Sequence, residues 1–336
     1  MKKLPDRHTG PGLVDLQLNG YAGVDFLSES IQWNDEDLHK VRGAISSDGV
    51  SVAVITFVTS GPESLVARGR HYRQLVEADD DLARAFPALH IEGPFISSVT
   101  GPRGAHAEEH CTTPREHPDL IDRVQEASGG RVAIVTLAPE LPGAIDLTRR
   151  CADQGICVAI GHTEATPEQI LQAVDAGARM STHLGNGSHQ TLPRLDNYVQ
   201  AQLAEDRLWA SFMSDGHHMP FTTLKNFIRA KTPERSILIT DAIAATELPP
   251  GIYRFGEQVI EVSPEGRCQK PGEENLAGSV LPLDRAVVNT CLHCDVTFEQ
   301  AWAMASTIPA ALIGLQPPEN VTVSVTDKGF TRQPDA

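Results

Sequence analysis

The sequence has no long hydrophobic run and no cluster of basic residues. None of its 336 residues falls in a stretch of roughly eighteen apolar residues that could span a membrane, and the N-terminal segment lacks the apolar core of a signal peptide. The 28 Lys and Arg residues are scattered, and the formal net charge is −16 at pH 7. Because nucleic acids and anionic membranes are bound by clustered positive charge, we expect neither as a partner and place the protein in the cytoplasm.

The six cysteines lack the paired spacing of a disulfide framework. Cys291 and Cys294 form a CxxC, but no second half of a zinc-binding motif accompanies them. They lie in a segment with a helical pattern, LPLDRAVVNTCLHC. We therefore expect buried helix residues rather than a metal or redox site.

Two nucleotide-binding motifs are also missing. The first apolar run is followed by NGYAGVDF, which lacks the GxGxxG spacing of a pyrophosphate cradle, and GxxxxGK[ST] is absent. An open, doubly wound sheet stays a competing fold at this point, but its dinucleotide-binding version is excluded.

Eight apolar, β-branched runs alternate with amphipathic segments that carry helix-start signals. This alternation is typical of a parallel sheet covered on both faces, and eight such units predict an α/β fold of the (β/α)8 barrel type. We expect one domain over residues 1–336, with a barrel core at about 11–315, a β-hairpin after the eighth strand, a helical region at 282–315, and a short tail at 316–336 that holds one weak strand and is otherwise mobile. The eight runs are residues 13–18, 50–58, 88–91, 132–137, 156–160, 178–182, 208–213 and 237–240.

Four polar residues each close one of these runs: Glu92, His162, His183 and Asp241. Strand ends in a barrel meet at one mouth, so residues far apart in sequence can converge there. One carboxylate and two imidazoles suit a divalent metal, and a further carboxylate is the usual partner of the water that such a metal activates. Each residue alone could be structural, for example a helix cap at Asp241. Their shared placement favours metal-assisted hydrolysis.

Further polar residues are expected at the same mouth. The histidines other than those at positions 106, 162, 183, 217 and 218 lack such a placement, and we interpret them as surface or core residues. The additional mouth residues are Gln17, Asn19, His106, Asn186, Arg194, Asp215 and His218.

Eight motifs, in register over residues 11–315, make the chain similar to the N-acetylglucosamine-6-phosphate deacetylase family of the amidohydrolase superfamily. The resemblance implies a (β/α)8 barrel that removes the acetyl group from an amino-sugar phosphate, N-acetylglucosamine 6-phosphate giving glucosamine 6-phosphate and acetate. The motifs are PGLVDLQLNGYAGVDF, HIEGPFIS, GAH, IGHTEAT, THLGN, SDGHH, TDAIAATELPPGIY and LAGSVLPLDRAV.

The resemblance also implies roles for individual residues. Glu92, His162 and His183 match the residues that hold the metal. Asp241 matches the general base, and His106 matches a residue that helps to polarise the substrate carbonyl.

Substrate contacts in the family fall on Asn186, Arg194 and His218. An Arg suits a phosphate because its planar fork binds two oxygens. The alternative for Arg194 is a surface side chain paired with a neighbour such as Asp196.

The first strand indicates how many metals are held. Family members with His-x-His there hold two metals and those with Gln-x-Asn hold one; this chain has Gln17 and Asn19. An amide is also a poor ligand beside imidazole. We therefore expect one divalent ion per chain, with zinc as the first candidate and iron or another divalent ion as alternatives.

Some features depart from the family pattern. The usual THLxNAM is THLGNGS here, and the accessory β-sandwich built from both termini is largely absent because few residues flank the barrel. Whether the chain pairs as a homodimer stays open. Two other functions also stay open: removal of the acyl group from another N-acyl amino sugar or N-acyl amino acid, and a catalytically silent, sugar-binding barrel.

Overall fold

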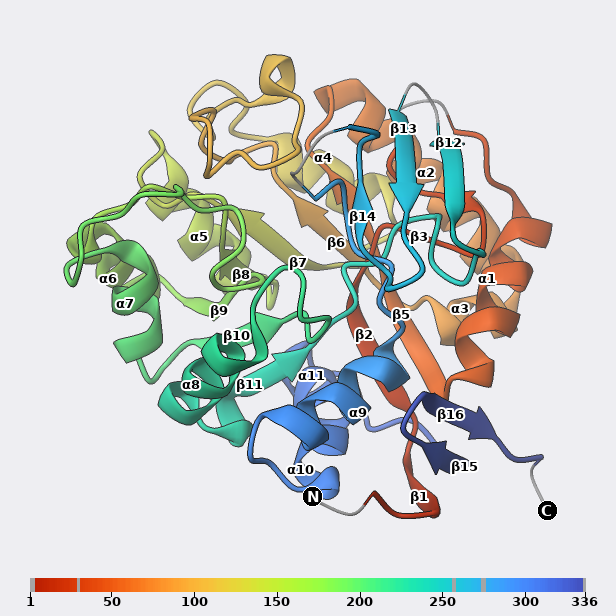
Figure 1. Ribbon diagram of the computed structural model, residues 1–336. Helices are drawn as coiled ribbons and strands as arrows, with labels where there is room; N and C mark the ends of the chain where they lie inside the picture. The colour runs from red at the N-terminus through yellow and green to blue at the C-terminus, as the bar shows by residue number, and fades with distance from the viewer. Residues whose placement is uncertain (1–3, 29–30, 256–257, 273–275, 335–336) are drawn as a thin grey trace.

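The computed structural model describes residues 4–28, 31–255, 258–272 and 276–334. Its centre is an eight-stranded parallel sheet in the order β11-β10-β9-β8-β7-β6-β5-β2 (Figure 1). Every strand of this sheet overlaps one of the eight predicted runs. The strands are β2 (Leu13–Leu18), β5 (Val50–Val58), β6 (Leu89–Glu92), β7 (Val132–Leu137), β8 (Cys157–Ile160), β9 (Ala178–Ser181), β10 (Trp209–Phe212) and β11 (Ser236–Leu238).

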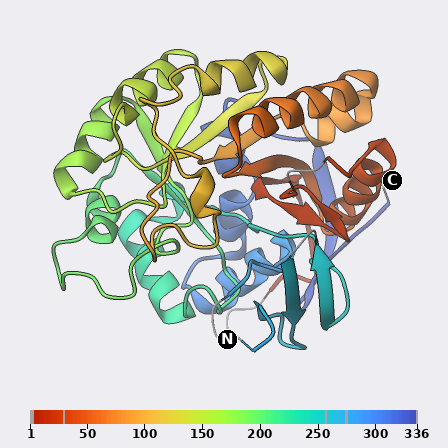
Figure 2. The same cartoon turned by 90° about the horizontal axis from the view of Figure 1, so that it is seen from above.

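The sheet closes between its first and last strands. Leu18 forms a parallel bridge with Ala242, just beyond β11, and the amide of Asn19 donates to the Ala242 carbonyl at 2.8 Å. Seen from above, the helices surround the strands (Figure 2). The predicted (β/α)8 barrel is thus confirmed.

Helix-start signals, expected in the amphipathic segments, are present at two of the barrel helices. Asn34 and Thr166 cap α1 and α6 through capping boxes, in which the side chain and the third helical residue satisfy each other's backbone amides. The barrel helices are α1 (Asp35–Ser47), α2 (Pro62–Ala78), α3 (Asp80–Ala85), α4 (Leu120–Ala127), α5 (Ala144–Asp153), α6 (Pro167–Asp175), α7 (Tyr198–Ala204) and α8 (Phe221–Lys231), with short 3-10 turns at η1 (Glu108–His110) and η2 (Pro233–Arg235).

Two apolar layers explain the unbroken hydrophobic runs. Val14, Leu16 and Ile134 belong to a cluster inside the barrel, whereas Leu13, Ile55 and neighbouring strand residues pack in the larger cluster with the helices. Because both faces of each strand are covered, both sets of alternating side chains must be apolar. The polar residues at the strand ends are the exceptions to this rule.

A small sheet follows β11 at the mouth end of the barrel. It contains β12 (Gly251–Phe255), β13 (Gln258–Val262) and β14 (Cys268–Gln269), paired antiparallel (Figure 1). This confirms the predicted hairpin, of which residues 256–257 lie outside the described ranges. A two-stranded ribbon of β3 (Gly20–Tyr21) and β4 (Val24–Asp25) follows β2.

The chain ends meet in a second small sheet at the opposite end of the barrel (Figure 1). Strand β1 (Arg7–Pro11) pairs with β15 (Asn320–Thr326), which pairs with β16 (Gly329–Arg332). The expectation of one weak strand in a mobile tail was wrong, because Val321, Val323 and Val325 alternate on a buried face. The predicted helical region forms α9 (Leu283–His293), α10 (Phe298–Met304) and α11 (Thr307–Leu312).

Cys291 and Cys294 are each 1% exposed, at the end of α9. Their burial agrees with the predicted core role. Of the helices in the described ranges, none combines the length and the apolar character that crossing a membrane requires.

Candidate active site

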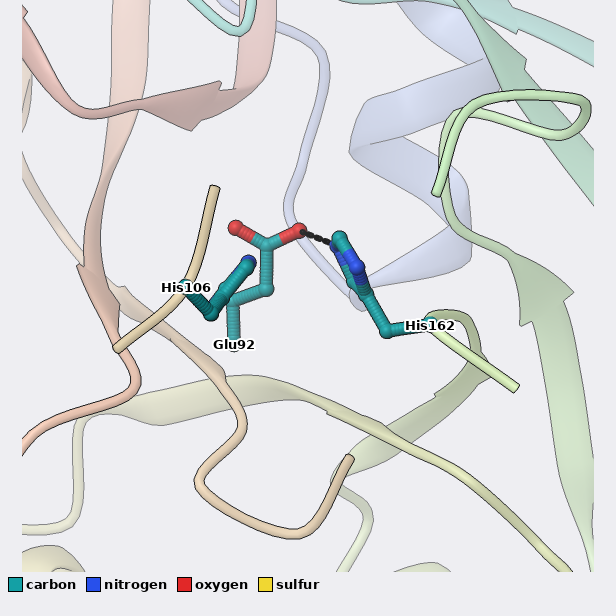
Figure 3. A group of neighbouring side chains, drawn as sticks. All are labelled: Glu92, His106 and His162. Carbon is teal, nitrogen blue, oxygen red and sulfur yellow. Dashed lines mark hydrogen bonds and ion pairs between the residues drawn. The ribbon is translucent and has the colours of Figure 1, made fainter. Parts of the chain in front are cut away.

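The ends of three barrel strands bring Glu92, His162 and His183 together. Nε2 of His183 lies 2.9 Å from Oε1 of Glu92, Nε2 of His162 lies 3.2 Å from the same oxygen, and the two nitrogens are 3.2 Å apart. All three residues are at most 5% exposed. Figure 3 shows the contact between Glu92 and His162, with His106 beside them.

These separations fit a shared metal. Ligand atoms 2.0–2.1 Å from a tetrahedral zinc lie about 3.3 Å from one another, close to the distances between the three atoms. Nδ1 of His162 donates to the Pro102 carbonyl at 2.8 Å, which orients the ring with Nε2 toward Glu92. His106 forms a second, overlapping group with two of these residues, since one ligand atom each from Glu92, His106 and His162 lie within 4.8 Å of one another. This His and Glu cluster is compatible with a divalent metal.

The two imidazoles determine the charge state of the Glu92 carboxyl. Burial by itself would raise the pKa of Glu92, but the hydrogen bonds and positive charge of His162 and His183 outweigh it and hold that pKa well below the usual range. Burial would likewise lower the pKa of His183, whereas the bond to Glu92 and the charges of Glu92 and Asp241 raise it. Glu92 is therefore an anion at neutral pH, as a metal ligand must be.

Two amides connect Glu92 to Asp241. Nε2 of Gln17 donates to Oε1 of Glu92 at 3.0 Å and to Oδ1 of Asp241 at 2.9 Å, and Nδ2 of Asn19 donates to the same Asp241 oxygen at 2.6 Å. Within the described part of the chain, the other Asp241 oxygen, Oδ2, accepts no hydrogen bond. Burial and then the charge of Glu92 raise the pKa of Asp241. Such a carboxyl can both take up and release a proton.

The backbone turns sharply at three of these strand ends. His162 has φ +51°, His183 has φ +27° and Asp241 has φ +51°, in the left-handed region that residues other than glycine rarely adopt. Such conformations cost on the order of 1–3 kcal/mol each and persist where the surrounding structure imposes them. Here each turn follows a strand whose register is fixed by its neighbours.

His106 reaches the cluster from the loop between β6 and η1. Its ring centroid lies 4.3 Å from that of His162, and its Nδ1 lies 2.8 Å from Oγ1 of Thr59. Burial, and then the charge of His162, lower the pKa of His106 to about 3. A neutral His106 offers one N–H.

The residues expected to contact substrate are less closely assembled. His218 is held by Asp215, whose Oδ2 lies 2.6 Å from Nδ1 of His218. The charge of His218 acts to lower the pKa of Asp241, against the larger effect of burial. Asn186 follows His183 in the same turn and lines a small hollow beside His162. Arg194 is exposed in the loop before α7 and makes no hydrogen bond or ion pair with the described residues, including Asp196.

The departure at THLGNGS has a packing explanation. A Cβ on Gly187 would lie 2.7 Å from Nδ1 of His162, and the residue has φ +55°. Gly104 packs against the same ring from the other loop, 3.4 Å from His162 Cε1 for an added Cβ. The backbone of two glycines, which have no side chain, therefore packs directly against this imidazole.

Three contacts of the site were not predicted. They come from Thr59, from the Pro102 carbonyl and from Asp15. Asp15 could have been found, because Asp15, Gln17 and Asn19 alternate along β2 and so share one face of the strand. Nothing in a sequence marks a backbone carbonyl such as that of Pro102.

Asp15 braces the turn before Asp241 from below. Its Oδ2 accepts from the Thr240 hydroxyl at 2.5 Å, and its Oδ1 accepts from the amides of Thr240 and Gln17, both at 3.2 Å. The Thr240 hydroxyl in turn accepts from the Ala242 amide at 3.1 Å. Burial raises the pKa of the Asp15 carboxyl to about 7.

We expect Asp15→Asn to change how stability depends on pH. The folded protein keeps the Asp15 proton up to about pH 7, whereas the unfolded chain releases it near 3.8, so the wild-type free energy of unfolding falls as pH rises through this window. The Asn side chain stays neutral: its Oδ1 can accept from the two amides, and its Nδ2 can donate to the Thr240 hydroxyl in place of the reverse bond. Relative to wild type, the variant should gain at least about 1 kcal/mol between pH 5 and pH 8, measured by thermal unfolding.

The matched control is Asp146→Asn, which alters a largely exposed carboxylate on α5. Its difference from wild type should not vary with pH. A difference for Asp15→Asn that is equally constant would show that Asp15 is already ionised in the folded protein at pH 5.

No protein-family model matches the chain. N-acetylglucosamine-6-phosphate deacetylase of Homo sapiens is 34% identical over 92% of this chain and 75% of its own length. N-acetylgalactosamine-6-phosphate deacetylase of Escherichia coli O157:H7 is 31% identical over 95% of this chain and 84% of its own length. Among solved structures, a mutant N-acetyl-D-glucosamine-6-phosphate deacetylase of Mycobacterium smegmatis in complex with N-acetyl-D-glucosamine-6-phosphate matches with a TM-score of 0.83 and 28% identity, over 96% of this chain and 86% of that one. The motifs, the barrel and these relatives agree, and the chain belongs to the N-acetylglucosamine-6-phosphate deacetylase family of the amidohydrolase superfamily.

Proposed function

We propose that the protein hydrolyses the N-acetyl group of an amino-sugar phosphate, N-acetylglucosamine 6-phosphate in the first place, releasing acetate and the free amine. The observation that carries this proposal is the meeting of three ligand-type atoms within 3.2 Å, joined to the Asp241 carboxylate through Gln17. A silent barrel would have no need of this complete set. Relatives named for this activity cover nearly the whole chain.

We assign Glu92, His162 and His183 as the residues that hold one divalent ion, zinc being the first candidate because nitrogen and oxygen donors at these separations suit it. When bound there, the ion would supply the positive charge that makes water acidic and the acyl carbonyl electrophilic.

Asp241 is the proton carrier in this assignment. Gln17 and Asn19 fix one oxygen of its carboxylate, so the other is available to take a proton from the attacking water. A C–O bond forms as the water attacks the acyl carbon, and the C–N bond then breaks. Asp241 returns the proton to the departing nitrogen, which would otherwise leave as an amide anion. His106 is placed to donate its N–H to the acyl oxygen.

Asn186, Arg194 and His218 are proposed as substrate contacts. The exposed guanidinium of Arg194 is available to a phosphate, and the net charge of −16 means that such an anion needs a local basic group. A homodimer and a cytoplasmic location, where phosphorylated sugars are retained, complete the proposal.

An acyl-substrate panel tests the function. The panel holds N-acetylglucosamine with and without 6-phosphate, N-acetylgalactosamine 6-phosphate, and an N-acetyl amino acid, with acetate release as the readout. We expect release from the phosphorylated sugars and its loss on removal of metal by a chelator. Equal release from unphosphorylated sugar or from the amino acid would support the alternative substrates instead, and no release from a metal-replete protein would support a silent barrel.

Replacement of Asp241 should separate catalysis from metal binding. Asp241→Asn keeps the shape of the side chain but cannot carry the proton, so we expect kcat to fall on the order of a thousandfold or more while the metal content stays the same. Asp146→Asn, which changes an exposed carboxylate paired with Arg149 and in none of the site's contacts, is the control. Near-full activity in a metal-replete Asp241→Asn variant would remove Asp241 from this role.

The number of metals depends on the two amides of β2. Gln17 directs an N–H at both Glu92 and Asp241, which places hydrogens where a second cation would need lone pairs. Gln17→His with Asn19→His supplies imidazoles on the same face of the strand, and we expect metal analysis to rise from about one to about two ions per chain. Gln17→Asn with Asn19→Gln keeps both amides and should stay at about one. Two metals in the wild-type protein would contradict this assignment.

A further inference from the structure

The hydroxyl of Thr59 is the polar group that contacts the far side of the His106 ring. Thr59 directly follows β5 and is 4% exposed. Its Oγ1 lies 2.8 Å from Nδ1 of His106, and it lies 3.4 Å from the backbone carbonyl oxygen of Glu92. Thr59 therefore sits between a strand that carries a metal-ligand candidate and the loop that carries His106.

The proton position on His106 decides what its other nitrogen can do. A neutral imidazole carries one N–H, and the second nitrogen then holds a lone pair. With hydrogen on Nε2, the ring donates a hydrogen bond to an oxygen in the mouth. With hydrogen on Nδ1, Nε2 instead holds a lone pair. Because a ring nitrogen of His106 lies within 4.8 Å of the ligand atoms of Glu92 and His162, the ring then becomes a competing metal ligand.

Of the two contacts that the Thr59 hydroxyl makes, the one with His106 is the stronger. A hydroxyl has a single proton, and hydrogen bonds to it or from it weaken as the distance grows beyond about 3 Å. The 2.8 Å contact with Nδ1 is short, whereas the 3.4 Å contact with the Glu92 carbonyl is at the edge of the hydrogen-bonding range. The 2.8 Å contact itself fits either direction, because Nδ1–H can donate to Oγ1 just as Oγ1–H can donate to Nδ1. The anionic carboxylate of Glu92 favours the second direction, because the other ring nitrogen then directs a hydrogen, and not a lone pair, toward a cluster that contains a negative charge.

Neighbouring backbone fixes where the hydroxyl can lie. Gly93, with φ +82°, packs so closely that an added Cβ would be 2.1 Å from Oγ1 of Thr59. The glycine directly after Glu92 thus leaves a space that the hydroxyl fills. The position of Oγ1 is set by the strands β5 and β6, which pair in register at Val58 and Glu92.

We propose that Thr59 is a positioning residue, whose hydroxyl donates to Nδ1 of His106 and keeps the ring proton on Nε2, facing the acyl oxygen of the substrate. The proposal rests on the proposed function, because it presumes that His106 donates to a reacting carbonyl. Thr59 touches neither substrate nor metal in this scheme. It selects the tautomer, and so the role, of the residue that does.

Two substitutions separate the hydroxyl from its packing. Thr59→Val keeps the branched shape and removes the donor, whereas Thr59→Ser keeps the donor and removes a methyl group. We expect Thr59→Val to lower kcat about ten- to a hundredfold, less than or equal to the loss from removing one oxyanion donor, with KM within about twofold of wild type. Thr59→Ser should retain most of the activity. The control is Thr148→Val, which removes a buried hydroxyl that donates to the Ala144 carbonyl within α5.

The tautomer itself can be measured in parallel. In protein labelled with ¹⁵N-histidine, the nitrogen shifts distinguish a protonated from an unprotonated ring nitrogen, and the His106→Gln spectrum identifies the His106 signals. We expect hydrogen on Nε2 in the wild-type protein and a mixture of the two tautomers in Thr59→Val.

The outcomes keep this proposal apart from the proposed function. Hydrogen on Nδ1 in the wild-type protein overturns it, as does full activity in Thr59→Val. A Thr59→Ser variant as inactive as Thr59→Val also overturns it, because the loss would then come from packing. If the wild-type protein releases no acetate from any substrate, the proposed function fails, and the ¹⁵N spectrum still decides whether Thr59 sets the tautomer.

Discussion

The candidate site is organised around one buried negative charge, the carboxylate of Glu92. At 2% exposure this carboxylate has almost no contact with water, so neighbouring groups that direct positive charge or polar hydrogens at it must offset the free-energy cost of burying it. His162, His183 and Gln17 all direct nitrogens at the same oxygen, Oε1. The same oxygen is placed to act as a ligand of a metal cation. The arrangement that stabilises this buried charge therefore also prepares a metal site.

The barrel makes this arrangement rigid. Each strand is held by two neighbours, so the point at which its end enters the mouth is fixed, and the backbone can be bent there at a cost of on the order of 1–3 kcal/mol per strained residue. His162, His183 and Asp241 share this left-handed turn. The strained turns direct these three side chains into the shared mouth, and the packing of the strands beneath offsets the cost of the strain.

Much of this could be predicted, because both the fold and the site have strong local signals. A strand covered on both faces must be apolar throughout, so Glu92 and Asp241 stood out as the residues that end such runs. The tail was misjudged, since its alternating valines are a weaker signal that gains meaning only when β1 is found beside it. The carbonyl of Pro102 and the hydroxyl of Thr59 were missed, because which loop crosses which ring is decided by packing between segments distant in sequence. The surroundings of Arg194 likewise depend on a loop that the pattern does not specify.

The small sheet of β1, β15 and β16 joins the first and last described strands of the chain at the end of the barrel opposite the mouth. Its contacts reach the barrel floor through Trp302, whose indole donates to the Pro11 carbonyl at 2.9 Å, and through the Gly12 amide, which donates to the Glu319 carbonyl at 3.0 Å. A tag, a surface or a fused protein attached near β1 or β16 would therefore lie beside the floor of the barrel. Attachment at this sheet would leave the opposite end of the barrel, which carries the mouth, facing solution.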